Sequence, residues 1–295
     1  SGTWVAMNSN PFNWSILICL AVVWGSSFIL MKRGLEAFSP EQVAAYRIFI
    51  AFVFMLPFTF FHLRKDLHRH WKGLLGIGLF GNFIPAFLFT KAETGISSAL
   101  TGMLNSLTPL FTLLLGVLFF GNKAKAVHVI GIGLGLAGAV ALLYLGQESD
   151  FANNLSFGIY VVIATLCYGL SVNIIRKAMT DVTPVTAAVW SMCMIGPLAG
   201  AYLFSTDFIH ILYSHPKGWS SLLYTSILGI FGTALSVMIF NILVRNTTTL
   251  FASSVTYLIP IVAMLWGIAD GEEVLWLHFA CIALILTGIY LVTRK

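Results

Sequence analysis

The sequence has few charged residues: only 16 Lys or Arg and 11 Asp or Glu occur among 295 residues. Soluble domains average about 25% charged and about 45–50% apolar residues, whereas 58% of this chain is hydrophobic. A water-soluble fold would leave large apolar areas facing water. The composition therefore excludes a soluble enzyme, a nucleic-acid-binding protein and a disordered protein, and it indicates a membrane protein with many spans.

Cysteine is also scarce, and all four cysteines fall inside apolar stretches, where they are typical packing residues rather than disulfide or metal ligands. His62, His68 and His70 share one connector but lack the spacing of a metal site. The stretch Gly133–Gly138 matches G-x-G-x-x-G, yet it lies in an apolar run with no strand before it, so we interpret it as helix packing. We predict no catalytic residue, no metal ion and no cofactor.

Long apolar runs fill most of the chain, and a membrane-spanning helix needs about 20 such residues. The period-2 alternation of a membrane β-barrel is missing, so the runs predict helices. We expect ten spans, at about 13–31, 42–61, 73–90, 95–120, 127–145, 155–175, 183–206, 219–244, 249–269 and 274–293.

Basic residues in the connectors predict the orientation. If the N-terminus is cytoplasmic, the inner segments carry 11 Lys or Arg residues and the outer segments carry 4. The positive-inside rule then places both termini in the cytoplasm. We expect a multi-pass protein of the cytoplasmic (inner) membrane.

The sequence contains an internal repeat. Trp24-Gly25-Ser26-Ser27 recurs 144 positions later as Tyr168-Gly169-Leu170-Ser171, and Leu107-Thr108-Pro109 recurs 151 positions later as Leu258-Ile259-Pro260. Each copy holds five spans, and because five is odd the second copy enters the membrane from the opposite side. Inverted repeats of this kind enclose a midplane site in many transporters.

We therefore predict an all-α polytopic membrane protein with ten transmembrane helices in a 5+5 inverted-topology repeat. Residues 1–12 are interpreted as a tag remnant and an N-terminal tail. The first five-helix repeat is expected at 13–146 and the second at 147–295.

Several motifs resemble a known family. The order Trp24-Gly25-Ser26-Ser27-Phe28, Lys32, Ser39-Pro40, Arg47 and Ala51 is similar to the first helices of the drug/metabolite transporter superfamily, in particular its EamA-type ten-helix branch. Leu107-Thr108-Pro109-Leu110 and Tyr257-Leu258-Ile259-Pro260-Ile261 resemble the helix-four and helix-nine signatures. The resemblance covers about residues 14–293. It implies a 5+5 carrier for small metabolites, often amino acids or their relatives, and often an exporter.

The chain departs from the family pattern at two places. Asn122-Lys123 stands where the family commonly has an acidic residue after helix four. Ser191 in the second copy takes the place that Arg47 has in the first. A role that the family assigns to either position can therefore hold in only one of the two halves of this chain.

Four asparagines inside the spans are the strongest candidates for substrate contacts, because polar side chains are costly in a bilayer and often mark the path of a solute. An amide offers donors and an acceptor without a charge, which suits a polar neutral or zwitterionic solute. The alternative for each is a hydrogen bond that holds two helices together. The asparagines are Asn82, Asn105, Asn173 and Asn241, and Ser27 is added as a smaller polar candidate.

Aromatic rings at a similar depth could stack on a substrate or bind an amine by cation–π contact. The alternative is that they are packing residues or interface anchors. These residues are Trp24, Tyr168, Tyr257 and Trp266.

Glycines and prolines at matching places in the two copies are candidates for hinges and gates. A proline within a span removes a backbone hydrogen bond and frees a carbonyl, and broken helices often line transporter cavities. The alternative is a static kink or close packing. The candidates are Gly25, Pro109, Gly169 and Pro260.

Arg47 is the one charged residue that we place inside a span, about 10 Å into its helix. It could snorkel to the outer interface, pair with an acid such as Glu36 or Glu93, or bind a substrate carboxylate.

The predicted function is a secondary transporter that moves small metabolites by alternating access, as an exporter. The solutes expected are amino-acid-like, other polar or zwitterionic molecules, or amines. Helices one, three, four, six, eight and nine are expected to form the midplane cavity. The alternatives are a passive channel, a lipid scramblase and a membrane-embedded lipid-modifying enzyme. With no Asp, Glu or His placed well inside a span, facilitated transport, exchange and proton antiport stay open.

The expected partners are a small-molecule substrate and the lipid bilayer, with no nucleic acid. A monomer and a weak homodimer are both compatible with the sequence.

Overall fold

The computed structural model describes residues 10–63, 67–145, 150–246 and 255–293, without the side chains of residues 241, 242 and 244–246. Within these ranges the chain forms helices and no strand. Nine helical stretches there are long and apolar enough to cross a membrane, and a shorter apolar helix, Val255–Ala269, follows a segment outside the description. The fold is that of an all-helical polytopic membrane protein, as predicted.

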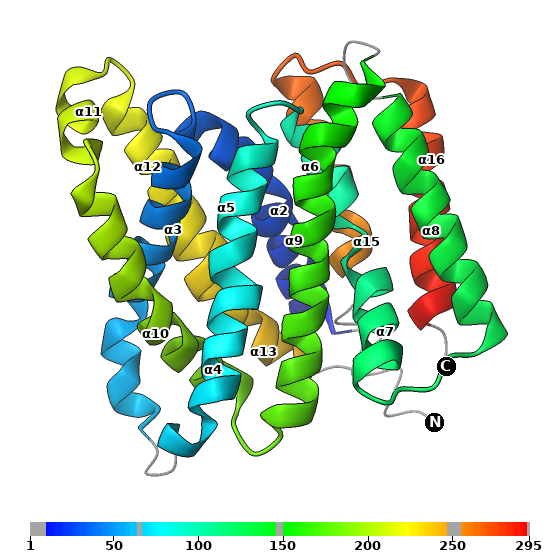
Figure 1. Ribbon diagram of the computed structural model, residues 1–295, viewed down its shortest axis with the longest axis horizontal. Coiled ribbons are helices and arrows are strands. Elements are labelled where there is room, and N and C mark those ends of the chain that lie inside the picture. Colours follow the sequence, from blue (N-terminus) through cyan, green and yellow to red (C-terminus); the bar gives the residue numbers. More distant parts are fainter. Residues whose placement is uncertain (1–9, 64–66, 146–149, 247–254, 294–295) are drawn as a thin grey trace.

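The first half of the chain forms spans one to five (Figure 1). Span one is α2 (Pro11–Gly34), and span two is α3 (Pro40–Met55) followed by the 3₁₀-helix η1 (Leu56–Phe61). Span three joins η2 (Leu67–His70), α4 (Trp71–Gly78), the π-helix η3 (Leu79–Phe83) and α5 (Ile84–Ala92). Span four is α6 (Ser98–Asn105) with α7 (Thr108–Phe119), and span five is α8 (Ala126–Tyr144).

The second half forms spans six to ten. Span six is α9 (Phe151–Ala178), and span seven is α10 (Pro184–Ser205), followed by the short helix α11 (Phe208–Ser214). Span eight joins α12 (Gly218–Gly229), the π-helix η5 (Ile230–Leu235) and α13 (Ser236–Asn246). Span nine is α15 (Val255–Ala269), and span ten is α16 (Trp276–Thr293).

Equivalent helices of the two halves begin with the same local devices. The side chains of Ser39 and Thr183 each accept a hydrogen bond from the backbone N–H of the residue three positions later. The residue that directly follows each of them is a proline. At the starts of α8 and α16, the ring nitrogens Nδ1 of His128 and His278 accept hydrogen bonds from the backbone N–H groups of Lys125 and Leu275. The repeat thus extends from the sequence to the backbone, and these histidines have a capping role.

The two halves run in opposite directions. In Figure 1, α2 rises from the lower end while its counterpart α9 descends from the upper end, and α2 begins at the same end at which α16 stops. The packing repeats with the halves exchanged: α9 packs against α5 and α7, and α2 packs against α12 and α15. Helix α3 pairs with its counterpart α10, and α8 pairs with α16.

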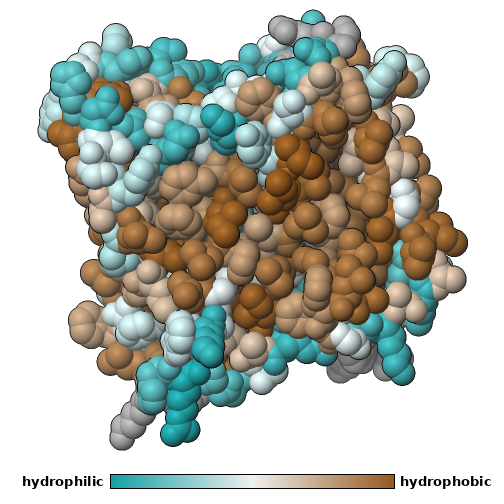
Figure 2. Space-filling model, viewed as in Figure 1, coloured by the Kyte–Doolittle hydropathy of each residue, from teal (hydrophilic) through white to brown (hydrophobic). Residues whose placement is uncertain are grey.

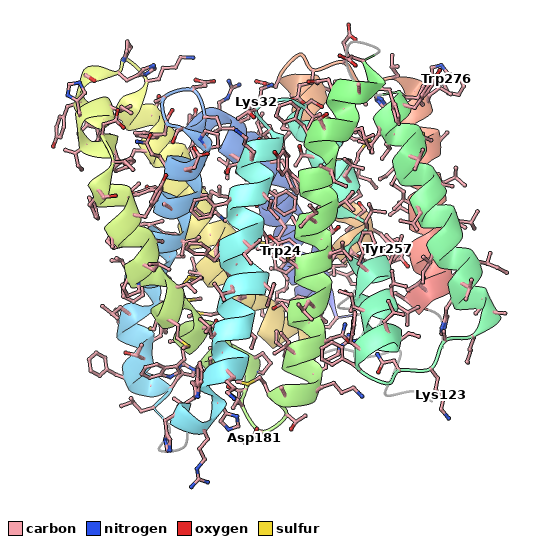
Figure 3. All side chains as sticks on the ribbon, in the orientation of Figure 1. Trp24, Lys32, Lys123, Asp181, Tyr257 and Trp276 are labelled. Atoms are coloured by element: carbon pink, nitrogen blue, oxygen red, sulfur yellow. The ribbon has the colours of Figure 1, made fainter. Side chains whose placement is uncertain are left out.

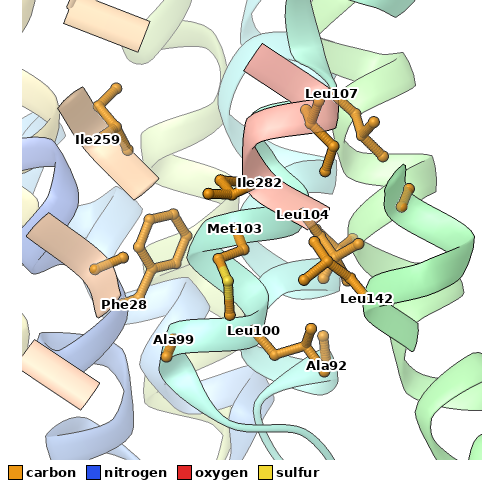
Figure 4. Close-up of a cluster of buried hydrophobic side chains, with 14 of the residues drawn as sticks. Phe28, Ala92, Ala99, Leu100, Met103, Leu104, Leu107, Leu142, Ile259 and Ile282 are labelled. Carbon is orange, nitrogen blue, oxygen red and sulfur yellow. The ribbon is translucent and has the colours of Figure 1, made fainter. Parts of the chain in front are cut away.

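Apolar side chains form a buried core and an exposed belt. The main buried cluster joins Leu104 and Leu107 of span four to Phe28, Leu142 and Ile259 of three other helices (Figure 4). Figure 2 shows hydrophobic residues across the middle of the molecule and hydrophilic residues at both ends. Such a belt suits a bilayer, where the backbone of each span must satisfy its own hydrogen bonds.

The glycine pattern of α8 is a packing surface, as predicted. A Cβ at Gly138 would lie 2.7 Å from Cγ1 of Ile285, and one at Gly135 would overlap Leu110. A Cβ at Gly133 would meet no atom within 4 Å. Two of the three glycines therefore allow close helix contact.

The two signature prolines differ in their local structure. Span four is interrupted after Asn105, and Pro109 lies at the start of the new helix α7. The expected kink at Pro109 is thus a break between two helices, because proline fits the first turn, where its missing N–H is not needed. Pro260 lies inside the continuous helix α15. Helix α11 was not predicted, since its seven residues continue the apolar run of span seven.

Candidate functional site

A small hollow lies near the midpoints of spans two, three, six and eight. It is lined by Arg47 and Ile48 of α3, Gly81 and Asn82 of η3, Tyr168 of α9 and Thr233 of η5. Arg47, Asn82 and Tyr168 are residues that the sequence singled out, and the fold brings them together. We call these lining residues the central site.

Both π-helices bring a polar side chain to the central site. A π turn inserts one extra residue into an α-helix, and such turns are frequent at functional sites. Phe80-Gly81-Asn82 of η3 matches Phe231-Gly232-Thr233 of η5 at an offset of 151 positions. Asn82 and Thr233 are thus equivalent residues of the two halves, and they meet at one hollow.

The guanidinium of Arg47 is held by neutral groups. Its Nε donates to Oγ1 of Thr233 at 3.2 Å, and Tyr168 lines the same hollow. Of the two acids considered as partners, Glu36 binds Arg33 at 2.6 Å and Lys217 at 2.7 Å instead. Among the described residues no carboxylate lies within 4.0 Å of Arg47. The central site thus has a cation but no anion in contact with it.

The central site is nearly closed. The space open to the centre of a water-sized sphere is about 10 Å³, which is enough for about one water molecule. A metabolite can therefore enter only if the surrounding spans separate.

Each π-helix packs against a span of the other half: η5 against span one and η3 against span six. A Cβ at Gly232 of η5 would lie 3.3 Å from Oγ of Ser27, and one at Gly81 of η3 would lie 2.6 Å from Oγ of Ser171, the counterpart of Ser27. Trp24 donates from Nε1 to the Gly232 carbonyl at 3.2 Å. Trp24 and Ser27, both predicted as substrate contacts, therefore stand behind the wall of the central site in this conformation.

The other predicted asparagines have different surroundings. Nδ2 of the buried Asn173 donates to the carbonyls of Thr112 at 2.8 Å and Gly169 at 2.9 Å, so Asn173 ties α9 to α7. This is the structural alternative that the sequence left open. Oδ1 of Asn105 is buried without a hydrogen-bond partner, at the break in span four. Asn241 belongs to α13, but its side chain lies outside the described residues.

Two predicted aromatic contacts lie away from the central site. Tyr257 packs against the buried cluster of span four, and its hydroxyl lies 3.4 Å from Oγ1 of Thr293 (Figure 3). Trp266 is 45% exposed and donates to Oγ of Ser26 at 2.7 Å. Neither ring lines the hollow, because their faces of α15 point to the buried cluster and to the surface.

The predicted hinge glycines mark close helix contacts. A Cβ at Gly25 of α2 would lie 2.5 Å from Cβ of Val262 in α15. A Cβ at Gly169 of α9 would lie 2.9 Å from the backbone of Phe111 and Thr112 in α7. Each glycine thus lets one of the equivalent helices α2 and α9 approach its partner.

Six charged side chains form a second feature at the upper end of the molecule, where Figure 3 labels Lys32. Lys32 Nζ binds Asp270 at 2.6 Å and Glu272 at 2.7 Å, and Arg33 also binds Asp270. Glu36 links Arg33 to Lys217, as described above. We call this group the upper cluster: Lys32, Arg33, Glu36, Lys217, Asp270 and Glu272.

Glu272 connects the upper cluster to the start of span four. Its carboxylate accepts hydrogen bonds from the backbone N–H of Ser98 at 3.1 Å, from the Ser98 hydroxyl at 2.8 Å and from the backbone N–H of Ala99 at 2.9 Å. Burial alone would raise the pKa of Glu272, but the hydrogen bonds from Lys32, Ala99 and Ser98 outweigh it and hold this pKa below its ordinary value. Spans one, four and nine are therefore joined at this end through one carboxylate.

A cavity of about 340 Å³ opens beside the upper cluster. It is lined by Lys32, Glu93, residues 94–98 and residues 270–272. Sequence reasoning missed this arrangement because it used Lys32 for orientation and for the family motif and placed the acids in a separate connector. The signal that could have found it is the opposite charge of Lys32-Arg33 and of the acids Asp270 and Glu272, because the predicted topology places both segments at the same end.

The family model that describes the EamA-like transporter family matches residues 13–144 and 156–294. The chain belongs to the EamA-like transporter family. It is a transporter rather than an enzyme, which excludes the membrane-embedded lipid-modifying enzyme that the sequence left open.

Relatives in this family share the full length of the chain. An "Uncharacterized inner membrane transporter YedA" of Escherichia coli (strain K12) is 26% identical, over 95% of this chain and 92% of its own. A "Probable amino-acid metabolite efflux pump" of the same strain is 26% identical, over 94% of this chain and 93% of its own. A solved crystal structure matches with a TM-score of 0.61 at 19% identity, over 97% of each chain, and it shows a shared fold.

Thr233 is the main lining residue of this EamA-like protein that sequence reasoning missed. A single threonine in an apolar span gives a weak signal, because its hydroxyl commonly bonds a carbonyl of its own helix. The signal that could have found it is the repeat itself, since Thr233 falls opposite Asn82 at the offset of 151 that already relates Leu107 to Leu258. Spans three, six and eight line the hollow as predicted and span two contributes Arg47, whereas the predicted spans one, four and nine do not line it.

Proposed function

We propose that this EamA-like protein is a secondary transporter of small zwitterionic metabolites of the amino-acid type, and that the central site binds them. Arg47 carries the proposal, because it is a cation in the middle of a span that donates to the neutral Thr233 and has no carboxylate within 4.0 Å among the described residues. A substrate carboxylate would supply the missing anion through charge-assisted hydrogen bonds.

The other lining groups suit the rest of such a molecule. Asn82 offers an amide, Thr233 offers a hydroxyl, and the ring of Tyr168 offers a face for an ammonium group or an apolar side chain. The absence of a described carboxylate at the hollow favours a zwitterion over a simple organic cation, which would lack a counter-charge.

Alternating access accounts for the closed state of the hollow. The hollow has room for about one water molecule, whereas the two halves repeat the same helix contacts in opposite orientations. A rocking movement that opens it to one side would correspond, by the repeat symmetry, to a movement that opens it to the other.

We infer that the upper end faces away from the cytoplasm and that the protein works as an exporter in the cytoplasmic membrane. The positive-inside count supports the orientation, and it places both termini in the cytoplasm. Direction rests on family resemblance and on the printed name of one relative, an efflux pump. A small-molecule substrate and the lipid bilayer remain the proposed partners.

Counterflow in liposomes tests the function. Full-length protein is reconstituted and loaded with an unlabelled amino-acid mixture, and uptake of the same amino acids in radiolabelled form is followed. We expect saturable counterflow from the wild type. Arg47→Met should reduce it by about 10- to 100-fold, since a hydrogen bond to a charged group contributes about 1.5–3 kcal/mol. The exposed Arg69 provides the control Arg69→Met, which should transport as the wild type does.

Two results would overturn this proposal. Uptake that neither saturates nor exchanges would indicate a channel or a scramblase. Equal counterflow by Arg47→Met and the wild type would remove the central arginine from substrate binding.

A further inference from the structure

Glu93 ends span three at the upper end of the molecule and has no described role in the central site. It follows α5, and its side chain lines the cavity beside the upper cluster. Both of its carboxylate oxygens are fully buried and have no hydrogen-bond partner. An ionised carboxylate that is buried without a partner costs several kcal/mol, so a buried group of this kind takes up a proton instead.

The neighbouring charges are already balanced without Glu93. The upper cluster contains three cations and three anions, each of them paired within it. Lys32, the cation beside Glu93 in the cavity wall, is already bound by Asp270 and Glu272. A charge on Glu93 would be a fourth negative charge in this group.

The charged groups that face Glu93 come from three elements. Lys32 of α2 and Glu272 of the turn after α15 line the same cavity as Glu93, and the field of Arg47 of α3 also reaches Glu93. Burial is the main cause that raises the pKa of Glu93 well above its ordinary value, and the field of Glu272 adds to it. The fields of Lys32 and Arg47 act in the opposite sense and are outweighed.

We propose that Glu93 is a proton-binding site of this transporter, protonated while the upper cluster is closed and its carboxyl group is buried, and deprotonated when the cluster separates and water reaches the carboxyl group. On opening, the O–H bond of the carboxylic acid breaks, the carboxylate keeps the electron pair, and the proton passes to a water molecule on the upper side. The hydrated carboxylate can then pair with Lys32, which the separation of the cluster has freed. The proposal rests on the transport function above, to which it adds a proton.

A proton site at Glu93 bears on whether transport can be coupled to protons. The sequence shows no acid well inside a span, and Glu93 lies one residue beyond the end of α5. The fold nevertheless buries its carboxyl group. A proton site is therefore available to a chain whose apolar stretches contain no acid.

The first test measures the stability of the full-length protein in detergent against pH, without any substrate. A carboxyl whose pKa is raised on folding stabilises the protein fully below its unfolded pKa, and this stability is lost as the pH rises through the folded pKa. The Tm of the wild type should therefore fall as the pH rises above the ordinary pKa of a glutamate side chain. Glu93→Gln, which cannot ionise, should lose most of this fall.

Two matched variants make the stability test specific. The exposed Glu273 lies next to the upper cluster, so Glu273→Gln removes a carboxylate from the same region and should follow the wild-type curve. Glu93→Asp keeps an acid at the site and should keep the fall. A Glu93→Gln curve parallel to that of the wild type would overturn the proposal. If Glu93→Gln did not fold, a Glu93→Asp curve without any fall would overturn it in the same way.

The second test measures opening. Ile96 lines the cavity and is buried, so Ile96→Cys in a background without the four native cysteines should react slowly with a membrane-impermeant maleimide. Raising the pH should increase its labelling severalfold when Glu93 is present. The same labelling is measured with Glu93→Gln added, and the ratio of the two rates at each pH cancels the ionisation of the thiol itself. A ratio that does not change with pH would overturn the proposal.

The failure of this inference can be told apart from failure of the transport function. Both tests above need no substrate, whereas counterflow needs no pH change. If the wild type shows counterflow, but its Tm and its labelling depend on pH in the same way as those of Glu93→Gln, the proton site alone is refuted. The reverse pattern, a proton site without saturable counterflow, would refute the proposed substrate transport.

Discussion

Arg47 keeps a full charge in the middle of the bundle with neutral partners, while Glu93 has no hydrogen-bond partner at all. The difference follows from chemistry, because a guanidinium cannot lose its proton in a protein whereas a carboxylate can gain one. Arg47 therefore favours an anionic group of a solute, and Glu93 favours a proton. In both proposals the residue responds to a ligand that the bilayer itself does not offer.

Substitution of Asn82 should impair transport, whereas substitution of Asn173 should impair stability. Asn82→Ala removes an amide from the central site and should reduce counterflow by about tenfold, the worth of one hydrogen bond of about 1–1.5 kcal/mol. Asn173→Ala leaves the carbonyls of Thr112 and Gly169 without their donor, so it should cost about 0.6–2 kcal/mol of stability. Its counterflow per folded molecule should match the wild type.

Tm and counterflow measured on the same preparations decide between these outcomes. Equal losses of both quantities in the two variants would mean that Asn82 also has only a structural role.

At the residue scale, the sequence predicted which side chains are costly in a bilayer but not which way they point. Arg47, Asn82 and Tyr168 line one hollow, as the search for polar and aromatic residues in spans suggested. Trp266 was equally prominent in the sequence, yet it lies half exposed on the surface. Depth in a span can be estimated from sequence position, whereas the direction of a side chain depends on how its helix is rotated in the bundle.

At the element scale, the ends of the helices were predictable and their interiors were not. Ser39-Pro40 and Thr183-Pro184 are standard start signals. Most predicted spans lie within a few residues of the observed ones, but span three begins six residues earlier than predicted, and the predicted start of span nine lies outside the described residues. The π-helices η3 and η5 have no such signal. They insert a residue into an apolar run without changing its composition, so only the three-dimensional fold reveals them.

The close contacts between helices yield a matched pair of glycine variants. Gly169→Ala places a methyl group 2.9 Å from backbone atoms of α7 that cannot move aside, and it should destabilise the protein by about 1–3 kcal/mol. Gly133→Ala adds its methyl group to open space on α8 and should be neutral or stabilising by up to about 1 kcal/mol. Thermal unfolding of both variants in detergent provides the measurement. A Gly169→Ala protein as stable as Gly133→Ala would contradict the close approach of α9 and α7.

At the scale of the whole molecule, the repeat in the sequence predicted most of the architecture. Two five-span units of opposite direction, with matched caps at α3 and α10 and at α8 and α16, follow from short motifs 144 to 151 positions apart. Contacts between the halves did not follow, because they depend on three-dimensional neighbours that no motif encodes. The joining of Lys32 to the turn after α15 is one such contact.

The orientation of the whole molecule can be measured by labelling. In a background without the four native cysteines, Ala152→Cys near the start of α9 should react with an impermeant maleimide in intact cells. Arg69→Cys at the opposite end should react only after the membrane is opened. Both positions are exposed, so burial does not limit either reaction. The opposite labelling pattern would reverse the topology and place the upper cluster in the cytoplasm.

The upper cluster also makes the two faces of the transporter unlike each other. In the first repeat, the positions that match Asp270 and Glu272 are Phe120 and Asn122. The lower end therefore has no acids at the two positions equivalent to those that bind Lys32 and Arg33 at the upper end. Dissolved salt weakens ion pairs that water can reach, and Lys32 and Lys217 are partly exposed. Higher ionic strength would then weaken the upper cluster, which has no equivalent made from these positions at the lower end. A symmetric fold would in this way become a transporter whose two half-cycles respond differently to the medium on each side of the membrane.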